Sequence, residues 1–140
     1  MAWYEYDPQR LLIERKAMAL KFPQFQLLKR EDAFCWLGTP ESNRGNKYEI
    51  LVEYPEHFPN MAPSVFPVTP GVNSTDLTDQ LKHHYPNGKL CLYYPGDRTF
   101  SNDTTAATVV VTAAWFFPYE AWLESGKRVW PGQELDHMQI

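Results

Sequence analysis

The sequence predicts an α+β fold in which helices pack against an antiparallel sheet. Three observations support this prediction: a helix-start signal near the N-terminus, short alternating strands in the first half, and a long apolar run over residues 104–123. At 140 residues the chain has the length of one domain, so we expect a single domain over residues 1–140.

The first half of the chain predicts one helix and four strands. Asp7 and Pro8 form an N-cap and first-turn pair, and the helix that they begin ends before Pro23. Two short apolar runs within residues 25–40 are typical of a hairpin, and residues 41–46 read as a second turn. Residues 47–55 alternate between large apolar and acidic side chains, which predicts a strand. A last short strand is expected around residues 64–68, where prolines limit its length.

Residues 104–123 are predicted to be a second helix. The run is too long for one strand, although Val109–Thr112 is β-branched. Ser101, Asn102 and Asp103 are capping candidates, and Gly126 followed by two basic residues marks the end. Pro118 is expected to kink this helix.

Composition and charge exclude several classes of function. The formal net charge of −4 provides no basic surface for nucleic acid or an anionic membrane. The sequence shows no signal peptide and no apolar run long enough to span a bilayer. We therefore expect a cytoplasmic protein that binds neither nucleic acid nor membrane, and whose two cysteines stay reduced. No phosphate-binding glycine loop is present, and no cofactor is expected.

The chemistry candidates gather in residues 81–103, LKHHYPNGKLCLYYPGDRTFSND. Cys91 is a buried small residue, a metal ligand or a nucleophile. Cys35, between Phe34 and Trp36 in a predicted strand, reads as an inert core residue. Cys91 instead follows an Asn-Gly turn signal in an irregular segment, where functional residues concentrate.

Two histidines precede this cysteine. A metal site is weakly supported, because no CxxC or HxxxH pattern and no second nearby cysteine accompany His83, His84 and Asp97. Either histidine is better suited to lowering the pKa of a thiol or moving its proton. Two solvent-facing histidines with no such role remain the alternative.

Three stretches resemble the ubiquitin-conjugating enzyme family. Residues 48–66, YEILVEYPEHFPNMAPSVF, are similar to the family's third strand and its proline-rich turn. Residues 87–92, NGKLCL, are similar to the segment that carries its thioester-forming cysteine, and residues 98–111 resemble the opening of its crossover helix. The resemblance implies the family's fold: an N-terminal helix, a four-stranded antiparallel meander, an active-site loop and a crossover helix. The family's C-terminal helices are expected to be truncated, because few residues follow Gly126.

The chain departs from the family near the cysteine. The family has an H-P-N triplet upstream, which Tyr85, Pro86 and Asn87 mimic but lie too close to Cys91 to replace. An ungapped count places His83 where the family has its Asn, so His83 is the candidate proton shuttle or oxyanion support and His84 its alternative.

Residues 83–101 and 119–126 are very similar to compact bacterial relatives found in CBASS antiphage operons. That resemblance implies that Cys91 forms a thioester with the C-terminus of a cGAS-like nucleotidyltransferase (CD-NTase) and passes it to a target amine. A separate activating enzyme is a possible further partner. Tyr93, Tyr94, Asp97 and Asn87 are the candidate partner-binding residues.

Two alternatives use the same segment. In one, the protein is a non-catalytic module that only binds the C-terminal tail of its partner. In the other, it is a cysteine hydrolase or transpeptidase that trims the tail, with water or an amine as acceptor.

Overall fold

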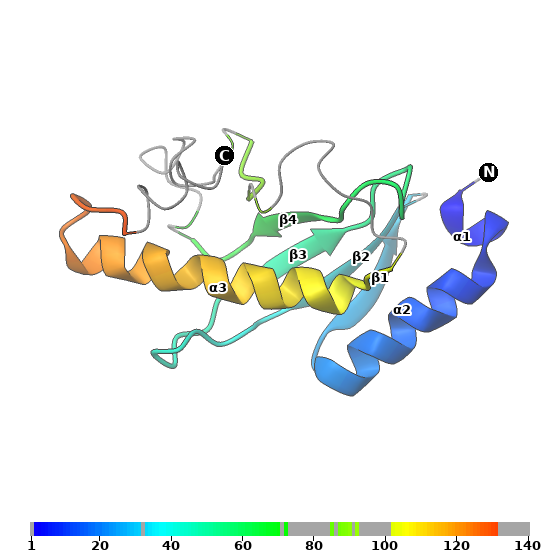
Figure 1. The fold of residues 1–140 in the computed structure, drawn as a ribbon, viewed down its shortest axis with the longest axis horizontal. Helices are drawn as coiled ribbons and strands as arrows, with labels where there is room; N and C mark the ends of the chain where they lie inside the picture. The colour runs from blue at the N-terminus through cyan, green and yellow to red at the C-terminus, as the bar shows by residue number, and fades with distance from the viewer. Residues whose placement is uncertain are drawn as a thin grey trace.

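The computed structural model describes residues 2–31, 33–70, 72, 85, 87–90, 92 and 102–131. These residues form an α+β fold, as predicted, with helices beside a four-stranded antiparallel sheet (Figure 1). The elements, in chain order, are α1 Trp3–Tyr6, α2 Pro8–Lys21, β1 Gln26–Arg30, β2 Ala33–Gly38, β3 Ile50–Glu53, β4 Ser64–Pro67 and α3 Thr105–Glu124.

The sheet is a meander in which each strand pairs with the next, in the order β1-β2-β3-β4. Its register pairs Trp36 of β2 with Val52 of β3, and Val52 with Val65 of β4. Directly opposite residues lie on the same face of a sheet, and all three of these side chains are buried. The predicted hairpin, second turn and two later strands are therefore confirmed, and Gly45 closes the second turn at φ +82.

Helix α2 begins as predicted, but two of the three residues that it buries are charged. The side chain of Asp7 accepts a hydrogen bond from the Arg10 N–H at 3.1 Å, and Pro8 occupies the first helical position. The residues that α2 buries are Arg10, Glu14 and Met18, whereas Leu20 is 83% exposed. The apolar residues of this segment therefore did not indicate which face meets the core.

Helix α3 matches the predicted range to within one residue and includes Pro118, and the expected kink there stays a prediction. Its N-cap is Thr104, which makes no side-chain cap, so the prediction of Asn102 or Asp103 as the cap is wrong. Ser101 lies outside the described residues. The predicted C-terminal signal is confirmed, since Gly126 adopts φ +74, which a residue without Cβ reaches easily.

The core lies between α3 and one face of the sheet (Figure 1). Phe116 of α3 stacks on Tyr48 with ring centroids 4.1 Å apart. Trp3 of the short helix α1, which the sequence did not indicate, packs against Tyr54 and Phe58. All five tryptophans of the chain are buried packing residues: Trp3, Trp36, Trp115, Trp122 and Trp130.

Candidate active-site segment

The turn before Cys91 is built by short-range hydrogen bonds. The Gly88 N–H donates to the Tyr85 carbonyl at 3.0 Å, and the Tyr85 N–H donates to the Lys89 carbonyl at 2.8 Å. The side-chain oxygen of Asn87 accepts from the Lys89 N–H at 3.0 Å, and Gly88 adopts φ +94. Asn and Gly therefore act as a turn pair, as predicted, because Asn bonds the backbone ahead of it and Gly tolerates a positive φ.

The chain then returns to the sheet. The Leu90 N–H donates to the carbonyl of Val65 in β4 at 2.8 Å, and the Leu90 side chain is 2% exposed. Leu92 is half-buried and packs against the same core. Leu90 is thus anchored on β4, and Leu92 is held against the core.

Most predicted site residues lie outside the described residues: Cys91, His83, His84, Tyr93, Tyr94 and Asp97. Asn87 is described and is exposed, with its oxygen engaged in the turn. Its role in partner binding stays a prediction.

Cys35, the other cysteine, is a core residue. Its side chain is 1% exposed in β2, opposite Leu28 and Glu53. Burial raises the pKa of its thiol. The positive charge of Arg30 lowers this pKa and the negative charge of Glu53 raises it, and the net effect is a raised pKa. A thiol held protonated and out of solvent is a poor nucleophile, so the prediction that Cys35 is inert in the core is supported.

A buried network fixes the chain where it enters α3. The carboxylate of Glu14, on α2, accepts hydrogen bonds from the Thr105 N–H and the Tyr54 hydroxyl, both at 2.9 Å. Arg10 lies 3.3 Å from the other carboxylate oxygen and donates to the carbonyl of Asp103. Burial first, and then the charge of Glu14, raise the pKa of Tyr54, which keeps that hydroxyl protonated as a donor. Sequence reasoning missed this network; the Arg10–Glu14 spacing is a helical ion-pair signal, but it does not report burial.

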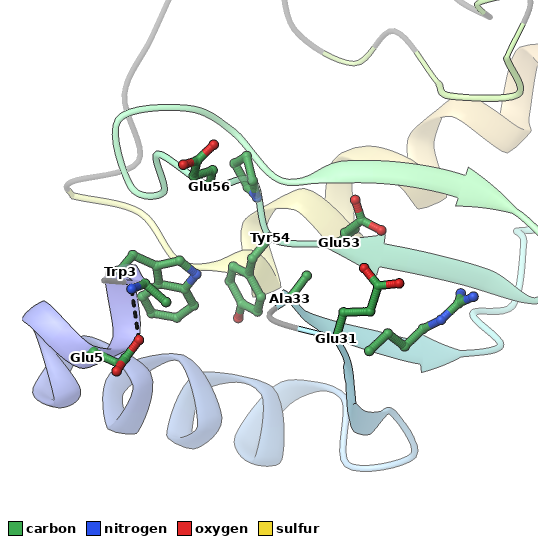
Figure 2. A pocket seen from close by; sticks show the side chains of 10 residues that line it. Trp3, Glu5, Glu31, Ala33, Glu53, Tyr54 and Glu56 are labelled. Carbon is green, nitrogen blue, oxygen red and sulfur yellow. Dashed lines mark hydrogen bonds between the residues drawn. The ribbon is translucent and has the colours of Figure 1, made fainter.

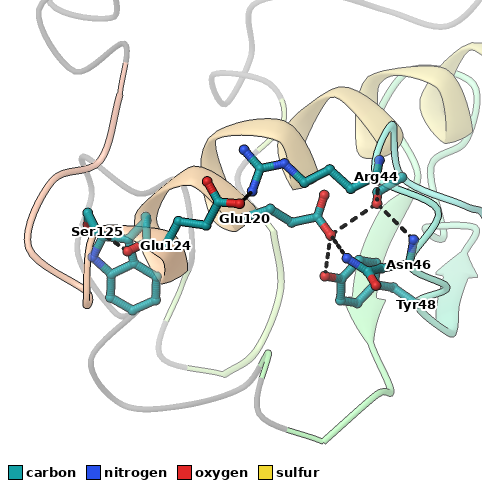
Figure 3. A network of polar contacts seen from close by, with 8 residues as sticks. Arg44, Asn46, Tyr48, Glu120, Glu124 and Ser125 are labelled. Atoms are coloured by element: carbon teal, nitrogen blue, oxygen red, sulfur yellow. Dashed lines mark hydrogen bonds and ion pairs between the residues drawn. The ribbon is translucent and has the colours of Figure 1, made fainter.

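A second network joins the β2–β3 connection to the C-terminal half of α3 (Figure 3). One carboxylate oxygen of Glu120, a residue 4% exposed, accepts from Ser42 at 3.0 Å, Asn46 at 2.6 Å and Tyr48 at 2.7 Å. Burial alone would raise the pKa of Glu120, but these hydrogen bonds outweigh it and hold the pKa below its usual value. Burial, with the adjacent carboxylate, raises the pKa of Tyr48. These groups therefore form a stable anchor for the connection.

A hollow of about 550 Å³ opens beside α1 and the ends of β2 and β3 (Figure 2). Trp3 and Tyr54 line it together with one arginine and four glutamates: Arg30, Glu5, Glu31, Glu53 and Glu56. It lies toward β1 and β2, whereas Leu90 bonds to β4 at the other edge of the sheet. The hollow is therefore separate from Leu90.

Within the described ranges, no group of three His, Cys, Asp or Glu side chains is arranged to hold a metal ion. The same part of the chain contains no helix long and apolar enough to cross a membrane.

Comparison with protein families gives one match. The model of the type II CBASS E2 proteins matches residues 14–138, which is most of the chain and includes the segment around Cys91. The chain belongs to the type II CBASS E2 family. Comparisons with curated proteins and with solved structures gave no match.

The resemblance to CBASS E2 proteins is thus confirmed, and the four-stranded sheet with its helices is compatible with a ubiquitin-conjugating fold. Membership places this E2 protein in an antiphage defence system with a conjugation-like role, associated with other components of a CBASS operon. In this E2 protein the turn at Asn87 and Gly88, the anchor of Leu90 on β4 and the Glu14 network hold the chain on both sides of the candidate nucleophile.

Proposed function

We propose that this CBASS E2 protein is a cysteine-dependent acyl transferase. Cys91 forms a thioester with the C-terminus of a CD-NTase and passes that acyl group to a target amine. The observation that carries the proposal is the family match across residues 14–138, because E2 proteins are conjugating enzymes and only two cysteines exist in this chain. Cys35 is buried and its thiol pKa is raised, so the reacting thiol is assigned to Cys91.

The geometry of the described neighbours supports this role. A thioester nucleophile needs a fixed backbone, so that its sulfur meets the carbonyl carbon at the correct angle. Leu90, buried and bonded to Val65, and Leu92, packed on the core, supply that fixation in sequence on either side of Cys91. We propose that the active-site loop comprises the turn at Asn87 and the residues that follow it, and that α3 is the family's crossover helix.

The reaction proceeds in two displacements. The Cys91 thiolate adds to the C-terminal carbonyl of the CD-NTase, held as a thioester on an activating enzyme, and the donor thiolate leaves as the new C–S bond forms. A target amine then adds to the Cys91 thioester, the C–S bond breaks, the amine proton passes to a base and the thiolate is regenerated. The oxyanion that forms in each step needs a hydrogen-bond donor.

His83 is the proposed proton shuttle or oxyanion support, and His84 its alternative. If no activating enzyme participates and Cys91 attacks a peptide bond of the tail, a histidine must take the thiol proton and return it to the leaving amine. We propose that Tyr93, Tyr94, Asp97 and Asn87 contact the tail, and that residues 1–140 act as one domain in the bacterial cytoplasm.

The test is incubation of the protein with the CD-NTase encoded beside it, both with and without an activating enzyme and ATP, followed by non-reducing electrophoresis. We expect an adduct that a reducing agent cleaves, that persists in Cys35→Ala and that disappears in Cys91→Ala. Binding without an adduct would favour the tail-binding module. A CD-NTase shortened at its C-terminus, without transfer to any amine, would favour the hydrolase.

A further inference from the structure

Helix α3 carries an apolar stripe on the side turned away from the sheet. Ala107, Val110, Ala114, Phe117 and Ala121 make up this stripe, here called the α3 stripe. Val110 is 52% exposed and Phe117 is 56% exposed, while the alanines are exposed or half-buried. In Figure 1, α3 lies in front of the sheet, and no other described helix or strand covers the side turned to the viewer.

The spacing of the α3 stripe is a heptad pattern. Its residues follow one another at intervals of three, four, three and four, which places them on one line along a helix that meets another helix. The opposite side of α3, with Val109, Thr112 and Phe116, is buried against the sheet. No charged residue occurs between Thr105 and Tyr119, whereas a solvated helix face normally carries charges. The stripe therefore has the properties of a helix-docking face.

We propose that a second copy of this chain occupies the α3 stripe, with the two α3 helices antiparallel about a twofold axis. The axis passes between Ala114 and Phe117. Each layer then pairs a small side chain with a large one: Ala114 of one copy meets Phe117 of the other, and Val110 meets Ala121. A twofold axis makes both sides of the interface identical, so one stripe must complement itself, and this alternation of sizes does so.

Charge at the ends of the α3 stripe favours the antiparallel arrangement. Glu124 follows the stripe at the next heptad position, with its side chain 68% exposed, and pairs with Arg44 at the surface. At the other end, Lys21 of α2 lines a hollow of about 320 Å³ together with Ala107, and Asp103 is the one acidic residue in its lining. Antiparallel packing brings Glu124 of one copy to Lys21 of the other. A parallel pair would instead place Glu124 beside Glu124 and Phe117 against Phe117.

The expected dimer is weak. One helix pair buries less surface than the ~800 Å² per partner of a standard interface, which places the dissociation constant in the micromolar range. The proposal does not depend on the proposed function, because it concerns the E2 protein without its CD-NTase.

The first experiment measures mass by sedimentation equilibrium from ~1 to ~300 µM, a range that brackets a micromolar dissociation constant. We expect the wild-type protein to shift from monomer to dimer across this range and Phe117→Glu to stay monomeric. The matched control is Leu12→Glu on α2, since Leu12 is also 56% exposed, and it should dimerise as the wild type does. Val110→Lys, with Val68→Lys as its control, repeats the comparison, and circular dichroism shows that each variant is folded.

The second experiment tests the direction of the helices. Lys21→Glu and Glu124→Lys should each weaken the dimer about tenfold, and the double variant should recover most of that loss because the charges are exchanged. A wild-type protein that is monomeric at every concentration would overturn the proposal. So would a Phe117→Glu variant that still dimerises. If the wild type is monomeric and Phe117→Glu loses CD-NTase binding, the stripe serves the partner protein and the proposed dimer is wrong.

Discussion

The carboxylate of Glu14 on α2 accepts a hydrogen bond, 2.9 Å long, from the N–H of Thr105, the first residue of α3. The two residues are 91 positions apart in the chain, so this bond is a helix cap supplied by another helix. Thr104 makes no side-chain cap, and a negative charge near the start of a helix is stabilising. The relationship fixes the start of α3, which follows the candidate active-site segment in the sequence.

Substitution of Glu14 should strongly destabilise the fold. Glu14→Ala removes the buried partner of Arg10 and the acceptor of Tyr54 and Thr105, and loss of one side of a buried ion pair costs about 3–5 kcal/mol. Urea unfolding followed by circular dichroism measures this loss. Glu14→Gln keeps an oxygen acceptor and should lose less, and Glu5→Gln, a change at an exposed residue, is the control. A Glu14→Ala loss under about 1 kcal/mol would show that the network contributes little.

Glu120 should make stability depend on pH. Its folded-state pKa is lowered, so its contribution is present above the unfolded pKa and is lost as pH falls through the folded pKa. The difference in unfolding free energy between wild type and Glu120→Gln should therefore be larger at pH 7 than at pH 3, with the change below about pH 5. Glu56→Gln, at an exposed position, is the control. Parallel curves for wild type and Glu120→Gln over this range would contradict the assignment.

Local sequence signals predicted the elements well where they act alone. Asp7 and Pro8 fixed the start of α2, Gly126 the end of α3, and the alternation from Tyr48 to Tyr54 the inward face of β3. The features that local signals missed are contacts between residues that are distant in the chain. From the sequence alone, Glu14 is expected at the surface, because its hydrogen-bond donors Tyr54 and Thr105 lie far from it in the chain.

The candidate site was predictable to the same degree. Asn87 and Gly88 form the predicted turn because both act on their own backbone. The anchor of Leu90 on Val65 joins segments far apart in sequence, so no local pattern reports it. Helix α2 shows the same limit of local signals. Leu20 is exposed, so hydrophobicity alone did not indicate which face of this helix packs inward.

The two cysteines should react very differently with a thiol reagent such as Ellman's reagent. Cys35 is 1% exposed and its thiol pKa is raised, so it should react only after unfolding. Cys91, the proposed nucleophile, should react rapidly in the native protein. We expect one rapid thiol in the wild type, one in Cys35→Ala and none in Cys91→Ala. Two rapid thiols in the native wild type would contradict the burial of Cys35.

His83 and His84 should differ in their effect on adduct formation. His83→Ala should slow the single-turnover formation of the Cys91 adduct more than His84→Ala does, because His83 occupies the family's helper position by register. Removal of one proton-transfer or oxyanion group typically costs about 10²–10³-fold in rate. Cys91 labelling with iodoacetamide, measured against pH, distinguishes a catalytic effect from a loss of folding. Equal rates in the two variants would remove the assignment to His83.

The central claim is that Cys91 carries the C-terminus of the CD-NTase as a thioester, and intact mass spectrometry tests it most directly. We expect an adduct whose mass equals the two chains less one water, cleaved by thiols in the wild type. In Cys91→Ser the same adduct should form as an ester that thiols do not cleave, and in Cys91→Ala it should be absent. An adduct that survives in Cys91→Ala, or wild type and Cys91→Ser adducts with the same sensitivity to thiols, would contradict the claim.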